Sequence, residues 1–481
     1  MSQIMRFCYS MTANQCYLIP KLAEQDHVGF EIRLDSFEKK PDFKALRALT
    51  DRPLLATFRS KPHLGLATTR ARDRKGWAWR QWSMEAGFDL IDIELDEPGL
   101  AARMDEVHRN DLKTVLSHHE LGDNAGLEPA FDKALETDAS IIKIIGSGWS
   151  SSDFLLQRQH YQRASGRAFV HFYMGAEFTA SRVMSLIYGA PFTFITPFPG
   201  EAVAPGQLTR EDVEEIYQPD RIELSQMKLF SVIGLPIGHS RSPMFHNPKL
   251  REIDQNALFV PLPASSREDF LSLKEAFPEL SGCAVTKPMK EVAYQEANRF
   301  LDPNSESLGA VNTLILDDDI AATNTDLLAM IEILENLKDI DGEATEVLIL
   351  GYGGLGRAVV RACSSLGIPA LISNRTPGRV DHLPEGVTEI PWSERHKEGP
   401  TIVVQATSAG MSPHTAISPM ETLPESVKYL IETIYNPAET RLMKMAREQN
   451  IEVIDGMALF EGQARIQNRF FIDRLNPDCA D

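Results

Sequence analysis

The sequence predicts an α/β chain, with an N-terminal (β/α)8 barrel followed by two further α/β units. Short apolar runs rich in β-branched residues alternate with amphipathic stretches along most of the 481 residues, and strands that alternate with helices form parallel sheets. A chain of this length corresponds to about three domains at roughly 150 residues each. A strand, a glycine turn and a helix follow one another at residues 346–367, which indicates a separate unit late in the chain.

Eight strand-like runs, with helical patterns between many of them, occupy roughly the first 200 residues. That number of strand–helix units in that length suggests a closed (β/α)8 barrel, and other layered α/β folds produce the same alternation. The expected strands lie at residues 5–11, 27–34, 53–58, 88–95, 112–117, 139–146, 168–174 and 192–197.

The organisation changes after this set of runs. Residues 208–223 have the pattern of a final amphipathic helix followed by a linker, and residues 227–234 open a new strand. We therefore predict a first domain over residues 1–217 and a linker over residues 218–226.

Composition excludes several classes of protein. The formal net charge is −19 and no dense stripe of lysine and arginine offsets it, so we expect no nucleic-acid partner. No run approaches the roughly 18 apolar residues of a spanning helix, so we expect no membrane segment. The five cysteines, Cys479 among them, are widely spaced and lack a C-x-x-C pair, so neither a disulfide framework nor a metal site is expected. The N-terminus resembles the start of a strand and not a signal peptide, which favours a cytoplasmic location.

Lys143 is the sharpest feature of the first domain, because it stands alone in the apolar strand expected at residues 139–146. A buried unpaired lysine is rare, since removing an ammonium group from water is costly. One interpretation is structural: the lysine pairs with a carboxylate, or reaches water from a strand end. The other is functional: burial lowers the pKa of the amine, and the neutral amine attacks a carbonyl to form a Schiff base. Both interpretations stay open at this point.

Charged and imidazole side chains recur near the ends of neighbouring predicted strands. Each of them alone is typical of a solvated strand end. A parallel barrel, however, collects its active-site residues at the carboxyl ends of its strands. The candidates beside Lys143 are Glu31, Arg33, Glu94, His119, Arg182 and Gln207.

The motifs that contain these residues resemble type I 3-dehydroquinate dehydratases across residues 1–217. They are, in order, E-I-R-L-D, D-I-E-L, S-x-H, the lysine in I-I-K-I, and A-P-G-Q. The resemblance implies dehydration of 3-dehydroquinate to 3-dehydroshikimate through an imine at Lys143, with His119 moving the proton and Glu94 orienting His119. It also implies that the substrate carboxylate is held by Arg182 and Gln207, and the ring hydroxyls by Glu31, Arg33 and Arg59.

Two departures from the family pattern concern substrate affinity. Val203 stands directly before A-P-G-Q, where the family usually has a serine, and so a hydroxyl contact to the carboxylate is missing. The segment after Arg59 is SKPHLGL and lacks the usual paired glycines. A weak or inactive dehydratase barrel therefore stays open as an alternative.

A glycine-rich turn, G-x-G-x-x-G, follows the strand expected just before residue 351 and opens a helix. Glycines at such a turn let a pyrophosphate approach the N–H groups at the helix N-terminus. The next predicted strand ends without the acid that binds the ribose of NAD, and Arg375 offers a partner for a 2′-phosphate, so we predict NADP as the cofactor. The candidate cofactor-binding residues are Gly351, Gly353, Gly354, Gly356, Asn374, Arg375 and Thr376.

Six segments follow in order in the second half of the chain: G-H-S-R-S-P (238–243), A-V-T-K-P-M-K (284–290), G-A-V-N-T (309–313), N-T-D (324–326), Y-N-P (435–437) and D-G-M-A-L-F-E-G-Q-A (455–464). Together they resemble shikimate dehydrogenase over residues 227–475. The resemblance implies NADPH-dependent reduction of 3-dehydroshikimate to shikimate, with Lys290 and Asp326 as the catalytic pair. Lys287 lies three residues before Lys290 and makes that assignment ambiguous, and Gln405 replaces the family's asparagine. The other implied site residues are Ser240, Ser242 and Tyr435 near the carboxylate, Thr286, Asn312 and Gln463 at hydroxyls, and Thr407 and Met411 at the cofactor.

The two resemblances together point to bifunctional dehydroquinate dehydratase–shikimate dehydrogenases, in which the first product is the second substrate. We predict a substrate-binding unit at residues 227–327, joined by a C-terminal helix at 456–475, and a Rossmann NADP-binding unit at 328–455. The expected partners are 3-dehydroquinate and 3-dehydroshikimate, and the chain is expected to be a monomer or a small homo-oligomer. An NAD-linked quinate/shikimate dehydrogenase and a non-catalytic regulatory protein remain as alternatives.

Overall fold

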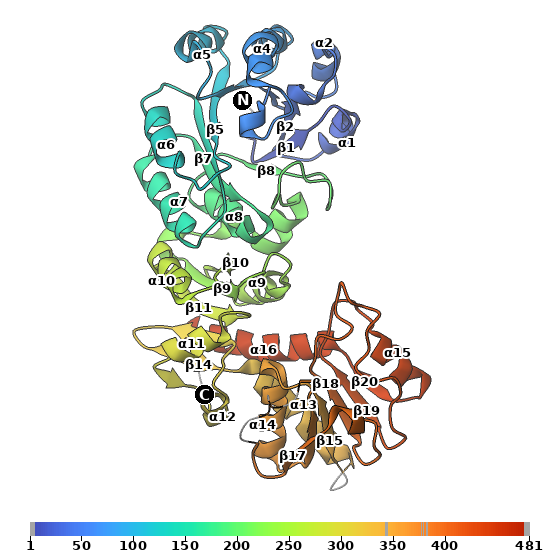
Figure 1. The fold of residues 1–481 in the computed structure, drawn as a ribbon. Coiled ribbons are helices and arrows are strands. Elements are labelled where there is room, and N and C mark those ends of the chain that lie inside the picture. The colour runs from blue at the N-terminus through green and yellow to red at the C-terminus, as the bar shows by residue number, and fades with distance from the viewer. Residues whose placement is uncertain (1–4, 342–344, 377, 379, 381–382, 476–481) are drawn as a thin grey trace. The chain divides into compact units, whose positions relative to one another are not determined.

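The computed structural model describes residues 5–341, 345–376, 378, 380 and 383–475. The chain divides into two compact units, Met1–Leu280 and Ser281–Asp481, whose elements are drawn in Figure 1. The predictions for the first four residues and for Cys479 lie outside the described residues. The predicted α/β fold class is confirmed, because a parallel barrel precedes a mixed sheet and a parallel Rossmann-like sheet.

Eight parallel strands form a near-closed barrel in the first unit, in the order β7-β6-β5-β4-β3-β2-β1-β8. Each strand falls within, or largely within, one of the predicted runs. The strand order shows that these runs form a barrel and not another layered α/β fold. The strands are β1 (Phe7–Met11), β2 (Val28–Arg33), β3 (Leu54–Thr57), β4 (Leu90–Glu94), β5 (Lys113–His119), β6 (Ile141–Ser147), β7 (Phe169–Met174) and β8 (Thr193–Ile195).

The alternation of side chains along β6 explains how a lysine fits into an apolar strand. Successive residues of a strand point to opposite faces, and the neighbours Ile142 and Ile144 are both fully buried. The register places Ser117 of β5 beside Lys143, and Glu94 of β4 beside Ser117. A row of polar side chains therefore crosses three adjacent strands at one level of the barrel.

Helices and turns connect the barrel strands (Figure 1). The helix predicted within residues 208–223 is a π-helical turn, η6 (Asp212–Tyr217), and the predicted linker contains the 3-10 turns η7 (Pro219–Arg221) and η8 (Leu224–Gln226). The connecting helices are α1 (Ile19–Leu22), α2 (Phe43–Arg47), α3 (Thr69–Ala71), α4 (Trp77–Glu85), α5 (Leu100–Arg109), α6 (Leu127–Leu135), α7 (Ser152–Arg163) and α8 (Thr179–Ile187), with the π-helical η4 (Arg72–Gly76) between α3 and α4 and the 3-10 turn η5 (Ala176–Phe178) before α8.

Two further strands complete the first unit. β9 (Lys228–Gly234) and β10 (Ala257–Pro263) pair in parallel. They are followed by α9 (Ser242–Glu252) and α10 (Arg267–Ala276), respectively. The loop between β9 and α9 holds the predicted substrate residue Ser240.

The second unit begins with a mixed sheet in which the strand order is β11-β13-β14-β12. β13 is antiparallel to both β11 and β14, whereas β12 is parallel to β14. The elements are β11 (Leu280–Val285), α11 (Lys290–Glu296), β12 (Arg299–Phe300), α12 (Pro303–Leu308), β13 (Thr313–Leu316) and β14 (Ile320–Thr323).

A six-stranded parallel sheet, in the order β17-β16-β15-β18-β19-β20, follows in the second unit. The strand order reverses between β15 and β18, and in open α/β sheets a crevice for a ligand lies at such a point. Within the described parts of the chain, no helix has the length and apolar character needed to span a bilayer. The elements are α13 (Thr325–Asp341), β15 (Val347–Leu350), α14 (Gly354–Leu366), β16 (Ala370–Ser373), β17 (Val387–Ile390), β18 (Ile402–Gln405), β19 (Tyr429–Glu432), α15 (Arg441–Glu448), β20 (Glu452–Ile454) and α16 (Gly456–Leu475).

Candidate active sites

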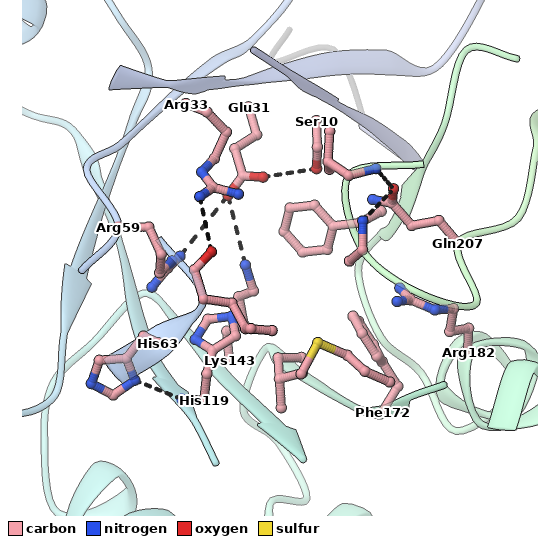
Figure 2. Close-up of a pocket in the computed structure, with 16 residues that line it drawn as sticks. Ser10, Glu31, Arg33, Arg59, His63, His119, Lys143, Phe172, Arg182 and Gln207 are labelled. Carbon is pink, nitrogen blue, oxygen red and sulfur yellow. Dashed lines mark hydrogen bonds and ion pairs between the residues drawn. The ribbon is translucent and has the colours of Figure 1, made fainter. Parts of the chain in front are cut away.

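The barrel contains a cavity into which Lys143 projects (Figure 2). Lys143 is 4% exposed; its Nζ lies 3.7 Å from Oε1 of Glu31 and 4.0 Å from the centre of the Phe194 ring. Burial lowers the pKa of Lys143, and the nearby carboxylate of Glu31 opposes that effect. The lysine is thus both paired with an acid and open to a cavity, so the two interpretations of its position are compatible.

Glu31 provides a fixed negative charge beside this amine. Burial by itself raises the pKa of Glu31, but the cations Lys143, Arg33 and Arg59 together lower it to about 2. Its Oε2 also accepts a hydrogen bond of 2.8 Å from Oγ of Ser10. The carboxylate is therefore ionised at neutral pH.

Glu94 belongs to an arginine network at one end of the barrel cavity. Its Oε2 accepts hydrogen bonds from Arg72 at 2.6 Å and from Oγ of Ser60 at 2.7 Å. Its Oε1 lies 3.4 Å from Nη1 of Arg59. Because its carboxylate oxygens bind these donors, Glu94 holds the two arginines in place.

His119, and not His118, lines the cavity. Burial holds the pKa of His119 well below its usual range, and the positive charges of Arg59 and Lys143 lower it further. Its Nδ1 has no hydrogen-bond partner among the residues that the structure describes. A neutral imidazole with a free ring nitrogen can accept a proton from a ligand.

His63 is a cavity residue that the sequence analysis did not single out. Its Nδ1 accepts the backbone N–H of His119 at 3.1 Å, and its Nε2 lies 3.5 Å from Oδ1 of Asp96. The sequence feature that could have indicated His63 is its place in SKPHLGL, the segment that departs from the family pattern. His63, Glu94 and Asp96 form a group of metal-ligand type, but Arg72 pairs with both carboxylates and already supplies positive charge there.

Arg182 is a buried cation that lacks an acidic partner within the described part of the chain. It is 1% exposed, its Nη2 donates to the carbonyl of Pro205 at 3.3 Å, and its guanidinium lies 4.0 Å from the Phe172 ring centre. Nε and Nη1 have no hydrogen-bond partner among the described residues. Burial lowers the pKa of Arg182 to about 9. This arrangement suits an anionic ligand, which would supply both charge and acceptors.

Three other predicted residues line the same cavity and are fixed by neighbours. Oε1 of Gln207 accepts a hydrogen bond from the backbone N–H of Val203 at 2.9 Å, and this bond closes the loop of residues 203–207. Arg33 donates to both oxygens of Asp35 at 3.0 and 2.8 Å. Arg59 donates to Ser117 at 2.6 Å and to Asp92 at 2.7 Å.

Lys290 and Asp326 form an ion pair in the second unit, with 2.7 Å between Nζ and Oδ2. Lys290 begins α11 and Asp326 lies in the first turn of α13. The side chains are 25% and 20% exposed, so both remain accessible to a ligand. Of the two lysines near this position, Lys287 is exposed to solvent. Among the ion pairs of the described residues, the one formed by Asp326 is with Lys290.

Thr325, which the sequence analysis did not single out, links two predicted residues of this unit. Oδ1 of Asn312 accepts from the backbone N–H of Thr325 at 2.7 Å, and Oγ1 of Thr325 donates to Oε1 of Gln463 at 3.1 Å. Because Thr325 precedes Asp326, the amides of Asn312 and Gln463 are set close to the ion pair. Thr286 is partly buried, and Tyr435 is 38% exposed, with its ring 5.9 Å from that of Phe460.

Ser240 and Ser242 lie in the first unit. Oγ of Ser240 donates to Oγ of Ser242 at 3.2 Å and accepts the backbone N–H of Ser242 at 3.3 Å. Ser242 is the first residue of α9. The two hydroxyls are therefore held together at the N-terminal end of this helix, where an anion is favoured.

The glycine turn requires glycine at two positions. Gly351 has a φ of +99°, and a Cβ there would lie 2.7 Å from Cγ2 of Thr407. A Cβ on Gly356 would lie 2.1 Å from the carbonyl oxygen of Gly351. By contrast, a Cβ on Gly353 or Gly354 would meet nothing within 4 Å, which leaves open space at the start of α14.

The residues after β16 lie beside the glycine turn. Oδ1 of Asn374 lies 3.3 Å from the backbone N–H of Tyr352, which ties this strand end to the glycine turn. Arg375 and Thr376 are exposed. On the other side of the turn, Gln405 accepts the backbone N–H of Thr407 at 3.0 Å and donates to Ala409, and Met411 is 42% exposed.

Comparisons with known proteins match both halves of the chain. The family model "Type I 3-dehydroquinase" matches residues 11–223, and "Shikimate dehydrogenase substrate binding domain" matches residues 232–314. A bifunctional 3-dehydroquinate dehydratase/shikimate dehydrogenase of Arabidopsis thaliana, described as chloroplastic, is 27% identical over 471 residues, covering 92% of this chain and 77% of the relative.

Two further relatives match in different ways. A shikimate dehydrogenase (NADP(+)) of Dictyoglomus thermophilum is 34% identical over 262 residues, covering 51% of this chain and 92% of the relative. A pentafunctional AROM polypeptide of Candida glabrata is 28% identical over 431 residues, covering 80% of this chain but 26% of that longer protein.

The fold and the two sites define a fused lyase and oxidoreductase, in which a parallel barrel precedes a dinucleotide-binding dehydrogenase. The chain belongs to the bifunctional type I 3-dehydroquinase and shikimate dehydrogenase family. Its activities are 3-dehydroquinate dehydratase and shikimate dehydrogenase, as the sequence analysis predicted.

Proposed function

We propose that the barrel dehydrates 3-dehydroquinate through an imine between the ring ketone and Nζ of Lys143. The observation that carries this proposal is a buried lysine with a lowered pKa in the same cavity as the neutral His119 and the unpaired Arg182. A neutral amine attacks the ketone carbon, and loss of water then gives the protonated imine.

His119 moves the proton in the step that follows. It takes a proton from the carbon next to the imine, and the electron pair of that C–H bond shifts towards the imine nitrogen. Return of this pair expels the hydroxyl of the next carbon, which leaves as water with the proton from His119. Water then hydrolyses the imine, releases 3-dehydroshikimate and frees Lys143. The low pKa of His119 supports this role, and a positioned proton shuttle is worth about 10²–10⁴-fold in rate.

The substrate carboxylate pairs with Arg182 in this proposal. Nε and Nη1 of Arg182 have no other partner among the described residues, and the NH₂ group of Gln207 is the second donor, since its oxygen is used within the loop. Glu31, Arg33 and Arg59 face the ring hydroxyls, and their fixed acid–base contacts keep them oriented.

For the second reaction, we propose that Lys290 and Asp326 act at the carbonyl of 3-dehydroshikimate. When bound, NADPH supplies the reducing equivalent. The ammonium of Lys290 stabilises the negative charge that develops on the carbonyl oxygen and donates a proton to it. Asp326 keeps Lys290 oriented, which their 2.7 Å contact supports. Ser240, Ser242 and Tyr435 hold the carboxylate, and Thr286, Asn312 and Gln463 hold hydroxyls.

We propose NADP rather than NAD as the cofactor. Arg375 and Thr376 are exposed directly after β16, where an NAD site usually has an acid. The glycine turn at Gly351, Gly353, Gly354 and Gly356 receives the pyrophosphate, and Asn374, Thr407 and Met411 line the remainder of the site. The shikimate dehydrogenases that match this chain are named as NADP(+) enzymes, which supports the proposal.

A coupled assay tests both halves. Purified protein is given 3-dehydroquinate and NADPH, and the loss of reduced-cofactor absorbance is followed. Lys143→Ala abolishes oxidation of NADPH from 3-dehydroquinate but not from added 3-dehydroshikimate. Borohydride added with 3-dehydroquinate leaves a mass adduct on the peptide that contains Lys143. Full dehydratase activity of the Lys143→Ala variant contradicts the imine mechanism.

A further inference from the structure

The loop that carries Ser240 is tied to the barrel by one carboxylate, that of Glu177. Glu177 lies in η5, the 3-10 turn between β7 and α8 of the barrel. Its Oε2 accepts two successive backbone N–H groups of the loop after β9, from Ile237 at 2.5 Å and from Gly238 at 2.8 Å. Hydrogen bonds to an ionised acceptor are roughly twice as strong as neutral ones.

The same loop also lies directly against the barrel backbone. A Cβ on Gly238 would lie 2.8 Å from the carbonyl oxygen of Ala176, so only glycine allows this approach. Ile237 is 2% exposed. An unsatisfied N–H at such a buried position would be costly, and Glu177 provides its acceptor.

The hydrogen bond between Glu177 and Ile237 is linked to Ser240 through the backbone of a single residue, Ile237. The N–H of Ile237 binds Glu177, and its C=O accepts the backbone N–H of Ser240 at 2.9 Å. Ser240 in turn binds Ser242 through its hydroxyl. The carboxylate of a barrel residue is therefore two hydrogen bonds from a hydroxyl proposed to bind substrate in the other enzyme.

We infer that Glu177 is a positioning residue for the dehydrogenase: a side chain of the dehydratase barrel that holds the Ile237–Ser240 loop in its substrate-binding conformation. The inference rests on the proposed role of Ser240 as a carboxylate ligand. It follows that dehydrogenase affinity for shikimate depends on an acid that belongs to the other catalytic domain.

Steady-state kinetics of the full-length chain test this inference. Glu177→Ala raises the KM for shikimate about tenfold, because loss of the charged acceptor misplaces Ser240. The KM for NADP and the dehydratase kcat/KM for 3-dehydroquinate stay at the wild-type values. Glu177→Gln retains one acceptor oxygen and has a smaller effect.

Arg158→Ala is the matched control. Arg158 of α7 pairs with Glu279 at 2.8 Å and donates to the carbonyl of Ala276 at 2.9 Å. It thus joins α7 of the barrel to the residues at and after the end of α10, and not to the Ile237–Ser240 loop. This variant leaves the KM for shikimate unchanged. If Arg158→Ala raises it as much as Glu177→Ala does, the effect is general loosening and the inference is wrong.

Two serine variants separate failure of this inference from failure of the proposed function. Ser240→Ala raises the KM for shikimate, and the double variant Glu177→Ala/Ser240→Ala is no worse than Ser240→Ala alone, because both changes remove one interaction. If Ser240→Ala leaves this KM unchanged, the proposed role of Ser240 is wrong. If Ser240→Ala raises it and Glu177→Ala does not, only the role of Glu177 is wrong.

Discussion

Nζ of Lys143 and Oε1 of Glu31 lie 3.7 Å apart inside the barrel, and each residue shifts the pKa of the other. Burial lowers the pKa of the lysine, and the carboxylate raises it. The pair therefore sets how much neutral amine is present at a given pH, which is the form that attacks a ketone.

Replacing Glu31 with glutamine moves the pH dependence of the dehydratase. The change removes the charge that raises the pKa of Lys143, so the amine becomes neutral at a lower pH. The acidic limb of kcat/KM against pH shifts to lower pH, while the dehydrogenase profile stays the same. Rates measured with 3-dehydroquinate across the acid range check this, and an acidic limb that moves upward or does not move contradicts it.

Arg182→Met weakens substrate binding and stabilises the fold. The pKa of Arg182 is lowered to about 9 by burial, so a charged guanidinium costs free energy at neutral pH in the folded state. A buried methionine of similar length removes that cost. The KM for 3-dehydroquinate rises by about 100-fold, as expected for loss of a charge-assisted contact.

Thermal unfolding and kinetics of the same preparation check both effects. The melting temperature of the unliganded Arg182→Met protein is expected above that of the wild type. A lower melting temperature with an unchanged KM indicates a structural arginine and contradicts the proposed carboxylate site.

Val203→Ser improves the dehydratase. Val203 lines the cavity beside Gln207, and the new hydroxyl can donate to the substrate carboxylate. One such hydrogen bond lowers the KM for 3-dehydroquinate by about fivefold. Val203→Ala is the control, because it shortens the side chain without adding a donor. Equal KM values for Val203→Ser and Val203→Ala contradict a missing hydroxyl contact.

The sequence predicted residues that lie in strands better than residues in loops. Lys143 stands out because strand alternation fixes its face, and the same alternation separates His119 from His118. The eight barrel strands followed from the spacing of apolar runs.

Arg72, the partner of Glu94, and His63 show why other parts of the site could not be predicted. The strand register places Glu94 beside Ser117, but Arg72 arrives from η4, a turn whose π-helical form leaves no periodic signal. His63 lies in a 3-10 turn, where no strand or helix face indicates its direction. Where a residue of a loop or turn contacts the site depends on tertiary packing. Local sequence patterns do not encode that packing.

Lys290→Ala lowers the dehydrogenase kcat by about 10²–10⁴-fold, the range for loss of a positioned proton donor. Lys287→Ala is the matched control, because Lys287 is an exposed lysine three residues away. This variant is expected to retain near wild-type activity. The dehydratase activity of both variants stays unchanged. Shikimate oxidation by NADP and 3-dehydroquinate dehydration are measured on each. If Lys287→Ala is the inactive variant, the assignment within the V-T-K-P-M-K segment is reversed.

Arg375→Ala weakens the preference for NADP over NAD. Arg375 is exposed two residues after the end of β16, and an arginine there can bind a 2′-phosphate through paired hydrogen bonds. Without it, kcat/KM for NADP falls by about 10- to 100-fold, whereas kcat/KM for NAD stays constant, since NAD has no 2′-phosphate. NAD is thus an internal control for folding and for shikimate binding. An equal fall with both cofactors indicates a structural effect of the substitution, and a wild-type ratio in the variant shows that Arg375 does not bind the phosphate.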